Sequence, residues 1–135
     1  MVLLIDANII LDVLMNRNEF VIESSLIWKY CETHQAKGYI SALTIANLVY
    51  IMRKELDPKR IDTVISSLKM IFEIANLTSE DIILASKMQW RDFEDALQTA
   101  TNKRIQADYI ITRNVKDFRS SKVPAFTPSE LLERI

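Results

Sequence analysis

The segment Ala107–Phe118, with the sequence ADYIITRNVKDF, decides the fold class. It begins with a predicted strand, Asp108–Thr112, which follows a helix that opens at Asp92. Another short strand, Val123–Phe126, comes next, and Pro124 restricts it to the edge of a sheet because proline has no N–H to donate to a neighbouring strand. Helices and strands that alternate in this way favour a mostly parallel sheet covered by helices on both faces.

The same alternation extends back to the first residue. Met1–Ile5 is a continuous apolar run, which fits a strand buried on both faces. Asn8–Asn18 fits either a helix or a loop, and Lys37–Gly38 is interpreted as the stop signal of the helix before it. The other predicted elements are helices at Phe20–His34, Ser41–Lys54 and Thr78–Met88, helices that open at Asp57 and at Thr127, and strands at Tyr39–Ile40 and Phe72–Ala75.

Length and composition describe one ordinary globular domain. The chain has 135 residues, of which 49% are hydrophobic and 26% are charged, and chains of this kind bury a core of their own. We therefore expect a single domain over residues 1–135. The net charge of −1 excludes a general basic coat for nucleic acid, so any such binding must come from a local patch.

The chain has one glycine, one histidine and one cysteine, and this scarcity excludes several classes of functional site. The one glycine, Gly38, excludes phosphate-binding loops, since these need several glycines. The one histidine, His34, excludes paired-histidine catalysis and His-rich zinc sites. The one cysteine, Cys31, cannot form an internal disulfide, which suits a reducing cytosol. The longest uncharged run, Gly38–Met52, is too short to span a bilayer. These features predict a cytoplasmic protein.

Four acids fall where parallel sheets bind ligands, outside the carboxyl ends of the strands. Asp6 follows the first strand, and Asp117 follows Asp108–Thr112 after a short loop. Asp92 and Asp95 lie in the first turn of the helix before that strand. Carboxylates that are brought together repel one another, and a bound divalent cation relieves the repulsion. Oxygen ligands suit Mg²⁺ or Mn²⁺, and either ion can activate water for attack on phosphorus.

Each of these acids also has a purely structural interpretation. Asp6 could cap a following helix. Asp92 and Asp95 have the spacing of a capping box, and Asn114 and Asp117 share that spacing. For Asp92 we favour the helix cap, and for Asp95 the functional site.

A basic strip accompanies the acids. Arg113, Lys116, Arg119 and Lys122 recur every three residues around Asp117. They form either a solvated surface or a phosphate-binding strip beside the site, in which Arg113, Lys116 and Arg119 would contact RNA. Asp12, on the segment after Asp6, is either an acid that supports the site or a solvated residue.

Three segments together resemble the PIN domain family: Ile5–Asp12, Asp92–Gln98 and Ala107–Phe118. Their order and separation match that family, and the resemblance covers essentially the whole chain. It implies a PIN-like α/β fold, a three-layer α/β/α sandwich with a mostly parallel sheet of about five strands. It also implies an Mg²⁺- or Mn²⁺-dependent ribonuclease. Many members are toxins of toxin–antitoxin pairs, so RNA, a small antitoxin and a second copy of the chain are the expected partners.

The resemblance also implies roles for individual residues. It assigns the metal and the catalysis to acids, and it assigns their support to neighbouring polar side chains. The matching residues are Asp6, Asp95 and Asp117 for the metal site, and Asn8, Thr112 and Asn114 for support.

One position departs from the family. The helix after the second strand usually carries a glutamate there, and in this chain Asn47 occupies the position. An amide can accept a hydrogen bond or ligate weakly, but it brings no charge and cannot act as a carboxylate base. Either Asp92 supplies the missing acid, or metal affinity and activity are reduced. We expect Asn47 and Asp92 to tune the site.

Two function hypotheses follow. The first is an endoribonuclease in which the metal held by the three acids activates water. The second is a catalytically weak or inactive PIN-like domain that binds RNA or a protein. A phosphoryl-transfer domain with an aspartyl nucleophile is disfavoured, because Asn8 stands where such phosphatases have a second Asp and Ile5 and Ala7 flank Asp6 where a receiver has an acid.

Overall fold

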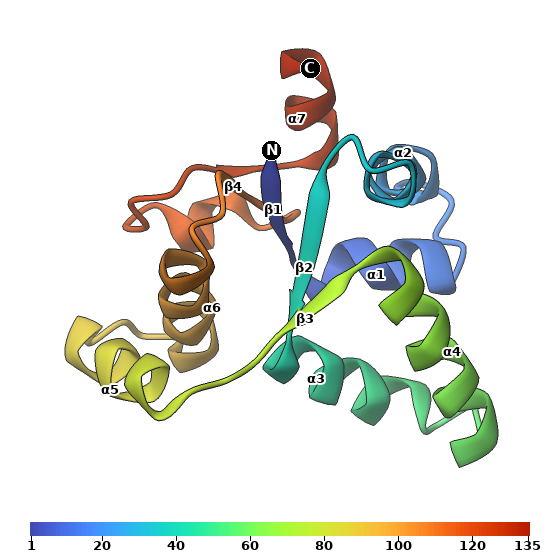
Figure 1. The fold of residues 1–135 in the computed structure, drawn as a ribbon, viewed down its shortest axis with the longest axis horizontal. Coiled ribbons are helices and arrows are strands. Elements are labelled where there is room, and N and C mark those ends of the chain that lie inside the picture. Colours follow the sequence, from blue (N-terminus) through green and yellow to red (C-terminus); the bar gives the residue numbers. More distant parts are fainter.

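The computed structural model describes all 135 residues, which form a five-stranded sheet with helices on both sides (Figure 1). The strands lie in the order β3-β2-β1-β4-β5, and every neighbouring pair is parallel. Their bounds are Val2–Ile5 for β1, Lys37–Ser41 for β2, Glu73–Ala75 for β3, Tyr109–Ile111 for β4 and Ala125–Phe126 for β5. The predicted α/β fold with a parallel sheet of five strands is confirmed, and all carboxyl ends share one edge.

Seven α-helices and one 3₁₀ helix connect the strands. Three of the predicted caps, Ser41, Asp57 and Thr127, accept backbone N–H bonds at the helix starts, and Thr78 forms the predicted capping box with Asp81. No helix has the length and apolar composition needed to cross a membrane. The bounds are Ala7–Leu14 for α1, Val21–Glu32 for α2, Ala42–Met52 for α3, Pro58–Ile71 for α4, Ser79–Met88 for α5, Phe93–Ile105 for α6, Val115–Phe118 for the 3₁₀ helix η1 and Pro128–Arg134 for α7.

One face of the sheet carries the main core. Sixteen buried apolar residues join Leu3 and Ile5 of β1 to side chains of α1, α2, α3, α4 and α7, such as Ile27 and Leu48. The core includes Cys31, and burial raises the pKa of its thiol to about 12. This face is therefore sealed by apolar packing in which the cysteine stays neutral.

Gly38 lies inside β2, so its interpretation as a helix stop signal is wrong. The helix before it already ends at Glu32, and the chain then turns through His34, whose φ is 62°. A Cβ on Gly38 would lie 2.6 Å from Cys31 Sγ and 2.8 Å from Phe72 Cδ1. The glycine is therefore explained by the packing of two distant side chains against the strand. The undecided segment Asn8–Asn18 contains the helix α1.

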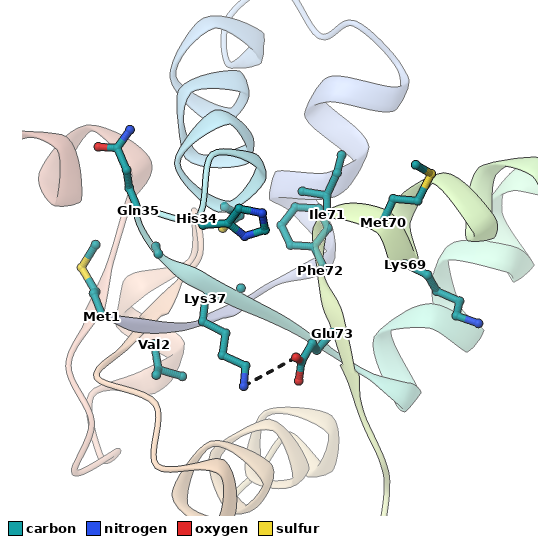
Figure 2. Close-up of a pocket in the computed structure, with 13 residues that line it drawn as sticks. Met1, Val2, His34, Gln35, Lys37, Lys69, Met70, Ile71, Phe72 and Glu73 are labelled. Carbon is teal, nitrogen blue, oxygen red and sulfur yellow. Dashed lines mark ion pairs between the residues drawn. The ribbon is translucent and has the colours of Figure 1, made fainter.

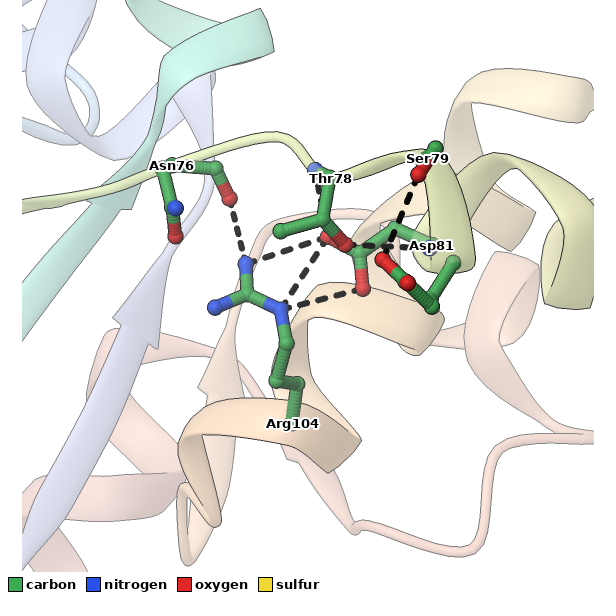
Figure 3. Close-up of polar contacts among 6 residues, drawn as sticks. Asn76, Thr78, Ser79, Asp81 and Arg104 are labelled. Atoms are coloured by element: carbon green, nitrogen blue, oxygen red, sulfur yellow. Dashed lines mark hydrogen bonds and ion pairs between the residues drawn. The ribbon is translucent and has the colours of Figure 1, made fainter.

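The opposite face is covered by α5 and α6 and is much more polar. Its apolar cluster consists of the buried Ala85, Ala96 and Leu97 with Leu43, Met88 and Trp90 packed against them, and the fully buried Leu4 and Ile110 lie outside the main core. Figure 3 shows the link between the two helices: Arg104 Nε of α6 donates to both carboxylate oxygens of Asp81 in α5, at 3.1 and 3.2 Å. Arg104 also donates to the carbonyl of Asn76, in the segment between β3 and α5, and to Asp81 Oδ2 at 3.0 Å. Polar bonds thus position α6 where apolar packing is sparse.

Candidate functional site

Asp6 stands at the carboxyl end of the central strand with both carboxylate oxygens hydrogen-bonded. Its backbone N–H donates to the carbonyl of Ile111 at 2.9 Å, which continues the ladder between β1 and β4. Oδ1 accepts from the N–H of Ala7 at 2.8 Å, so Asp6 is the N-cap of α1. Oδ2 accepts from Thr112 Oγ1 at 2.7 Å. The cap interpretation therefore holds, and it leaves the side chain rigidly oriented at the sheet edge.

The pKa of Asp6 is raised above its ordinary value. Burial is the main cause, and the negative charge of Asp117 adds to it. The bonds from Thr112 and Ala7 and the charge of Arg113 act in the opposite direction. A carboxylate whose ionised form is disfavoured in this way is stabilised by an additional positive charge.

Thr112 and the residues after it shape the end of β4. Thr112 is fully buried, and its hydroxyl donates to Asp6 and accepts from the N–H of Asn114 at 3.0 Å. Asn114 is exposed and opens η1 without a side-chain capping bond. Asp117 is exposed within η1, so it does not take part in a capping box. Asn8 is half-buried in the first turn of α1, beside Asp6.

Two acids at the start of α6 have the spacing of a capping box but differ in their roles. Asp92 is the N-cap, and its Oδ1 accepts from the N–H of Asp95 at 3.1 Å. The reciprocal bond, which Thr78 and Asp81 do form, is not made by this pair. Asp92 is thus the helix cap that we favoured, and the carboxylate of Asp95 stays available.

Asp95 carries the clearest electrostatic signature of the site. Its pKa is raised to about 6, first by burial and then by the charges of Asp92, Asp117, Asp6 and Glu94. None of these five acids forms an ion pair. Four of them, all except Asp6, line an open pocket of about 920 Å³ that also contains Trp90 and Ser120. The fold therefore gathers acids that form no ion pair from β1, α6 and η1 at one edge of the sheet, with Arg91 as a further residue of the pocket lining.

The donor set fits a hard divalent cation. Carboxylate oxygens are the ligands that such ions prefer, and a cation would relieve the repulsion that raises the pKa of Asp95. No three Asp, Glu, His or Cys side chains are yet close enough to enclose an ion. Asp6 is held by two bonds, whereas Asp117 is exposed. Binding therefore requires the more exposed acids to turn toward Asp6.

Asn47 lies beside these acids and contacts one that was not predicted. Its amide Nδ2 is 3.5 Å from Glu94 Oε2, across the gap between α3 and α6. Glu94 also raises the pKa of Asp95. The sequence contained a signal for it, since Glu94 is part of the segment Asp92–Gln98 that carries Asp95.

The basic residues of the predicted strip divide into two kinds. Lys116 and Arg119 are exposed on or next to η1, and neither forms an ion pair. The same is true of Lys122. Arg113 differs, because its guanidinium pairs with Asp12 at 3.2 Å and is mostly buried.

A second pocket, of about 490 Å³, lies at the other end of the sheet (Figure 2). It is lined by the amino ends of β1, β2 and β3, where Lys37 Nζ is 3.5 Å from Glu73 Oε1. None of the predicted site residues lines it. The carboxyl edge is thus where the predicted acids meet.

Comparison with known proteins gives a family and a fold. The model of a family described as "PIN domain" matches residues 2–116. A toxin–antitoxin complex from Klebsiella pneumoniae is 23% identical, with a TM-score of 0.71, over 93% of this chain and 96% of that one. FitAcB from Neisseria gonorrhoeae is 22% identical, with a TM-score of 0.70, over 96% and 99%. VapBC2 from Rickettsia felis, bound to a DNA fragment from its promoter, is 14% identical, with a TM-score of 0.68, over 94% and 98%.

At these identities the solved structures show a shared fold. A sequence comparison with curated proteins gives no significant match.

Proposed function

This chain belongs to the PIN domain family, and on that premise we propose that it is a metal-dependent endoribonuclease. One observation carries the proposal: the pKa of Asp95 is raised to about 6 by burial and by its acidic neighbours, which include Asp6 and Asp117. Three acids that come from distant parts of the sequence therefore act on one another at the carboxyl edge of the sheet. Metal-dependent hydrolysis of a phosphodiester needs such a concentration of oxygen ligands.

We propose Asp6, Asp95 and Asp117 as the residues that hold Mg²⁺ or Mn²⁺. When bound, such an ion activates water and stabilises the charge that develops at phosphorus. Thr112 supports the site by donating to Asp6, which fixes the direction of that carboxylate. Asp92 supports it by fixing the backbone of Asp95.

Three side chains with amides complete the proposed site. Asn8 and Asn114 flank Asp6 and Thr112, where they can donate to a phosphate oxygen or orient a water molecule. Asn47 donates toward Glu94 and so holds a further carboxylate next to Asp95. This contact makes Glu94, together with Asp92, a candidate for the acid that Asn47 does not supply.

The RNA contacts are proposed on the η1 side of the site. Lys116 and Arg119 lie next to Asp117 in the sequence, are exposed and have no acidic partner. A phosphate backbone that runs toward the acids would need such unpaired cations to offset the negative pocket. Arg113 was predicted to share this role, and its guanidinium pairs with Asp12.

We further propose that the protein is the toxin of a toxin–antitoxin pair, acts in the cytoplasm and forms a homodimer. The support is the fold it shares with FitAcB and with the toxin–antitoxin complex from Klebsiella pneumoniae. A small antitoxin and a second copy of the chain would then be its protein partners.

The decisive experiment measures cleavage of a labelled, unstructured RNA by metal-stripped protein to which Mn²⁺ or Mg²⁺ is returned. Asp95→Asn should abolish metal-dependent cleavage. Asp62→Asn is the matched control, because Asp62 is an exposed acid on α4 and should leave cleavage unchanged. Equal cleavage by wild type and Asp95→Asn would refute the assignment.

A second candidate function is a PIN-like domain that binds RNA or a protein with little hydrolysis. Two points favour it: Asn47 occupies the position where the resemblance predicts a glutamate, and no three ligands are preassembled around an ion position. Binding of RNA without turnover at saturating Mn²⁺ is the result that would support this candidate against the nuclease.

A further inference from the structure

We propose that Arg113 is a positioning residue which, clamped by the buried carboxylate of Asp12, holds the end of β4 so that Thr112 orients Asp6. The proposal rests on the proposed nuclease function only for its kinetic consequences. The contacts themselves link α1, α2 and the β4–η1 segment.

Asp12 is a buried charge that the proposed chemistry does not use. It lies in the last turn of α1 and is completely buried. Its Oδ2 accepts from the hydroxyl of Ser24 in α2 at 2.9 Å. Its Oδ1 lies 3.2 Å from Arg113 Nη2 and 3.4 Å from Arg17 Nη1. A fully buried carboxylate is costly without partners, and these three contacts supply them.

Arg113 is held from two sides. One end of its guanidinium pairs with Asp12, and its central carbon lies 4.0 Å from the centre of the Phe20 ring. The Nε atom is buried as well. An arginine that is stacked on an aromatic ring and paired with a buried carboxylate has few orientations left.

A closed series of contacts links Arg113 to Asp6 at the candidate metal site. Asp6 caps α1, and Asp12 lies at the other end of the same helix. Asp12 holds Arg113, which directly follows Thr112 in the sequence, and Thr112 Oγ1 donates back to Asp6 at 2.7 Å. The N–H of Asn114 donates to the same hydroxyl at 3.0 Å. The direction of the Asp6 carboxylate is thus coupled to an ion pair whose acidic member, Asp12, is completely buried.

This arrangement separates Arg113 from the other basic residues near the site. Lys116 and Arg119 are exposed and unpaired, whereas Arg113 shares the buried carboxylate of Asp12 with Arg17. A phosphate would have to displace a buried carboxylate to bind Arg113 fully, which would leave Asp12 without that partner.

Arg17 provides a matched control. It pairs with the same carboxylate, and its side chain is 32% exposed against 24% for Arg113. Arg17 belongs to the loop between α1 and α2 and, unlike Arg113, is not close to β4 in the sequence. Replacing either arginine by lysine keeps a positive charge and removes the planar guanidinium.

The experiment compares Arg113→Lys with Arg17→Lys in Mn²⁺ titrations and in RNA cleavage at several salt concentrations. Arg113→Lys should weaken Mn²⁺ binding and lower kcat, each by about tenfold, the effect typical of residues that orient metal ligands. KM for RNA and its salt dependence should not change. Arg17→Lys should stay within about twofold of wild type in each measurement.

A phosphate contact predicts a different pattern and would overturn the proposal. Lysine binds phosphate as well, so Arg113→Lys would keep kcat and Mn²⁺ affinity. Arg113→Ala would then raise KM and reduce the slope of log KM against log salt by about one. Equal losses in Arg113→Lys and Arg17→Lys would also overturn it, because they would indicate a general effect of the ion cluster on stability.

The test also distinguishes this proposal from the nuclease proposal. If the wild type cleaves no RNA, the Mn²⁺ titrations still decide the role of Arg113. If the wild type binds no Mn²⁺ either, hydrogen exchange of the Asn114 amide decides it, since that amide donates to Thr112. Faster exchange in Arg113→Lys and not in Arg17→Lys supports the proposal, and unchanged exchange in both variants overturns it.

Discussion

The two faces of the sheet are stabilised in different ways. The face under α1, α2, α4 and α7 has a core of 16 buried apolar residues. The face under α5 and α6 has an apolar cluster with three buried residues, a bidentate contact between Arg104 and Asp81, and two buried amides, Gln98 and Asn102, whose polar atoms have no partner in the protein. Figure 1 shows α5 and α6 as a pair on their own side of the sheet.

The apolar face supplies most of the stability, whereas the polar face positions the helix that carries Asp95. Apolar packing supplies most of the free energy of folding because it scales with buried area, but it is not directional. Asp95 lies on α6, and the position of that helix depends on directional bonds such as those of Arg104. Truncations of apolar side chains on the first face should therefore lower mainly the free energy of unfolding, whereas loss of the polar bonds on the second face should also shift α6, which carries Asp95.

The largest expected effect is a cavity on the apolar face. Leu48→Ala should lower the free energy of unfolding by about 3 kcal/mol, because Leu48 is buried in the main core. Leu97→Ala on the polar face should cost about 2 kcal/mol or less, because its cluster has only three buried members. Urea unfolding of both variants makes the comparison. Equal losses would contradict the difference between the faces.

The next effect concerns the link between α5 and α6. The pKa of Asp81 is lowered: burial opposes ionisation, but the bonds from Arg104 and Thr78 outweigh it. A lowered pKa in the folded state stabilises the fold at every pH above the ordinary pKa of the group. This stabilisation is lost as the pH falls through the pKa of the folded state. Asp81→Asn should thus cost about 2 kcal/mol at pH 7, and the loss should shrink below about pH 4.

The exposed pair of Lys37 and Glu73 serves as the control for that measurement. Glu73→Gln should change the free energy of unfolding by about 0.5 kcal/mol or less at any pH, because exposed ion pairs contribute little. A constant loss in Asp81→Asn from pH 3 to pH 7 would show that its carboxylate charge is not the cause.

A smaller effect of opposite sign is expected at Asp95. Its pKa is raised to about 6, so the folded protein binds a proton more tightly than the unfolded chain, and its stability falls as pH rises from about 4 to about 6. At pH 7 without metal, Asp95→Asn should be more stable than wild type by about 1 kcal/mol, a figure reduced for solvent screening. The difference should disappear near pH 4. A stability gain that is independent of pH would contradict this origin.

The smallest effect tests the buried amides of α6. Gln98→Met keeps the volume of the side chain and removes polar atoms that have no protein partner. The change should be neutral or stabilising by up to about 1 kcal/mol in thermal unfolding. A clear destabilisation would show that ordered water satisfies the amide, and the polar face would then be a hydrated layer.

Local signals in the sequence were sufficient for most of the fold. Ser41, Asp57, Thr78 and Thr127 were predicted to open helices, and each accepts a backbone N–H bond there. A cap interacts with residues two or three positions away, so its effect is independent of the rest of the chain. The parallel sheet could be predicted for a similar reason, because alternating helices and strands allow few other arrangements.

Gly38 was interpreted incorrectly in this way, and the contacts of Arg113 could not be predicted. Gly38 resembles a helix stop locally, but it is required because Cys31 and Phe72 press against β2. Arg113 resembles an exposed cation in a basic strip, and it is instead engaged by Asp12 and Phe20, which lie about a hundred positions earlier in the chain. Both depend on contacts between segments that the sequence does not mark as neighbours.

The sequence by itself determined the element order, the family and the three candidate acids, because caps, apolar runs and short motifs act over a few residues. Only the tertiary structure decided which charged side chains lie close enough to interact. Folding brings Asp6, Asp95 and Asp117 within electrostatic reach, places Glu94 beside Asn47, and encloses Asp12 between two arginines. Electrostatic energies depend on distance in space and on burial, and neither can be read from separation along the chain.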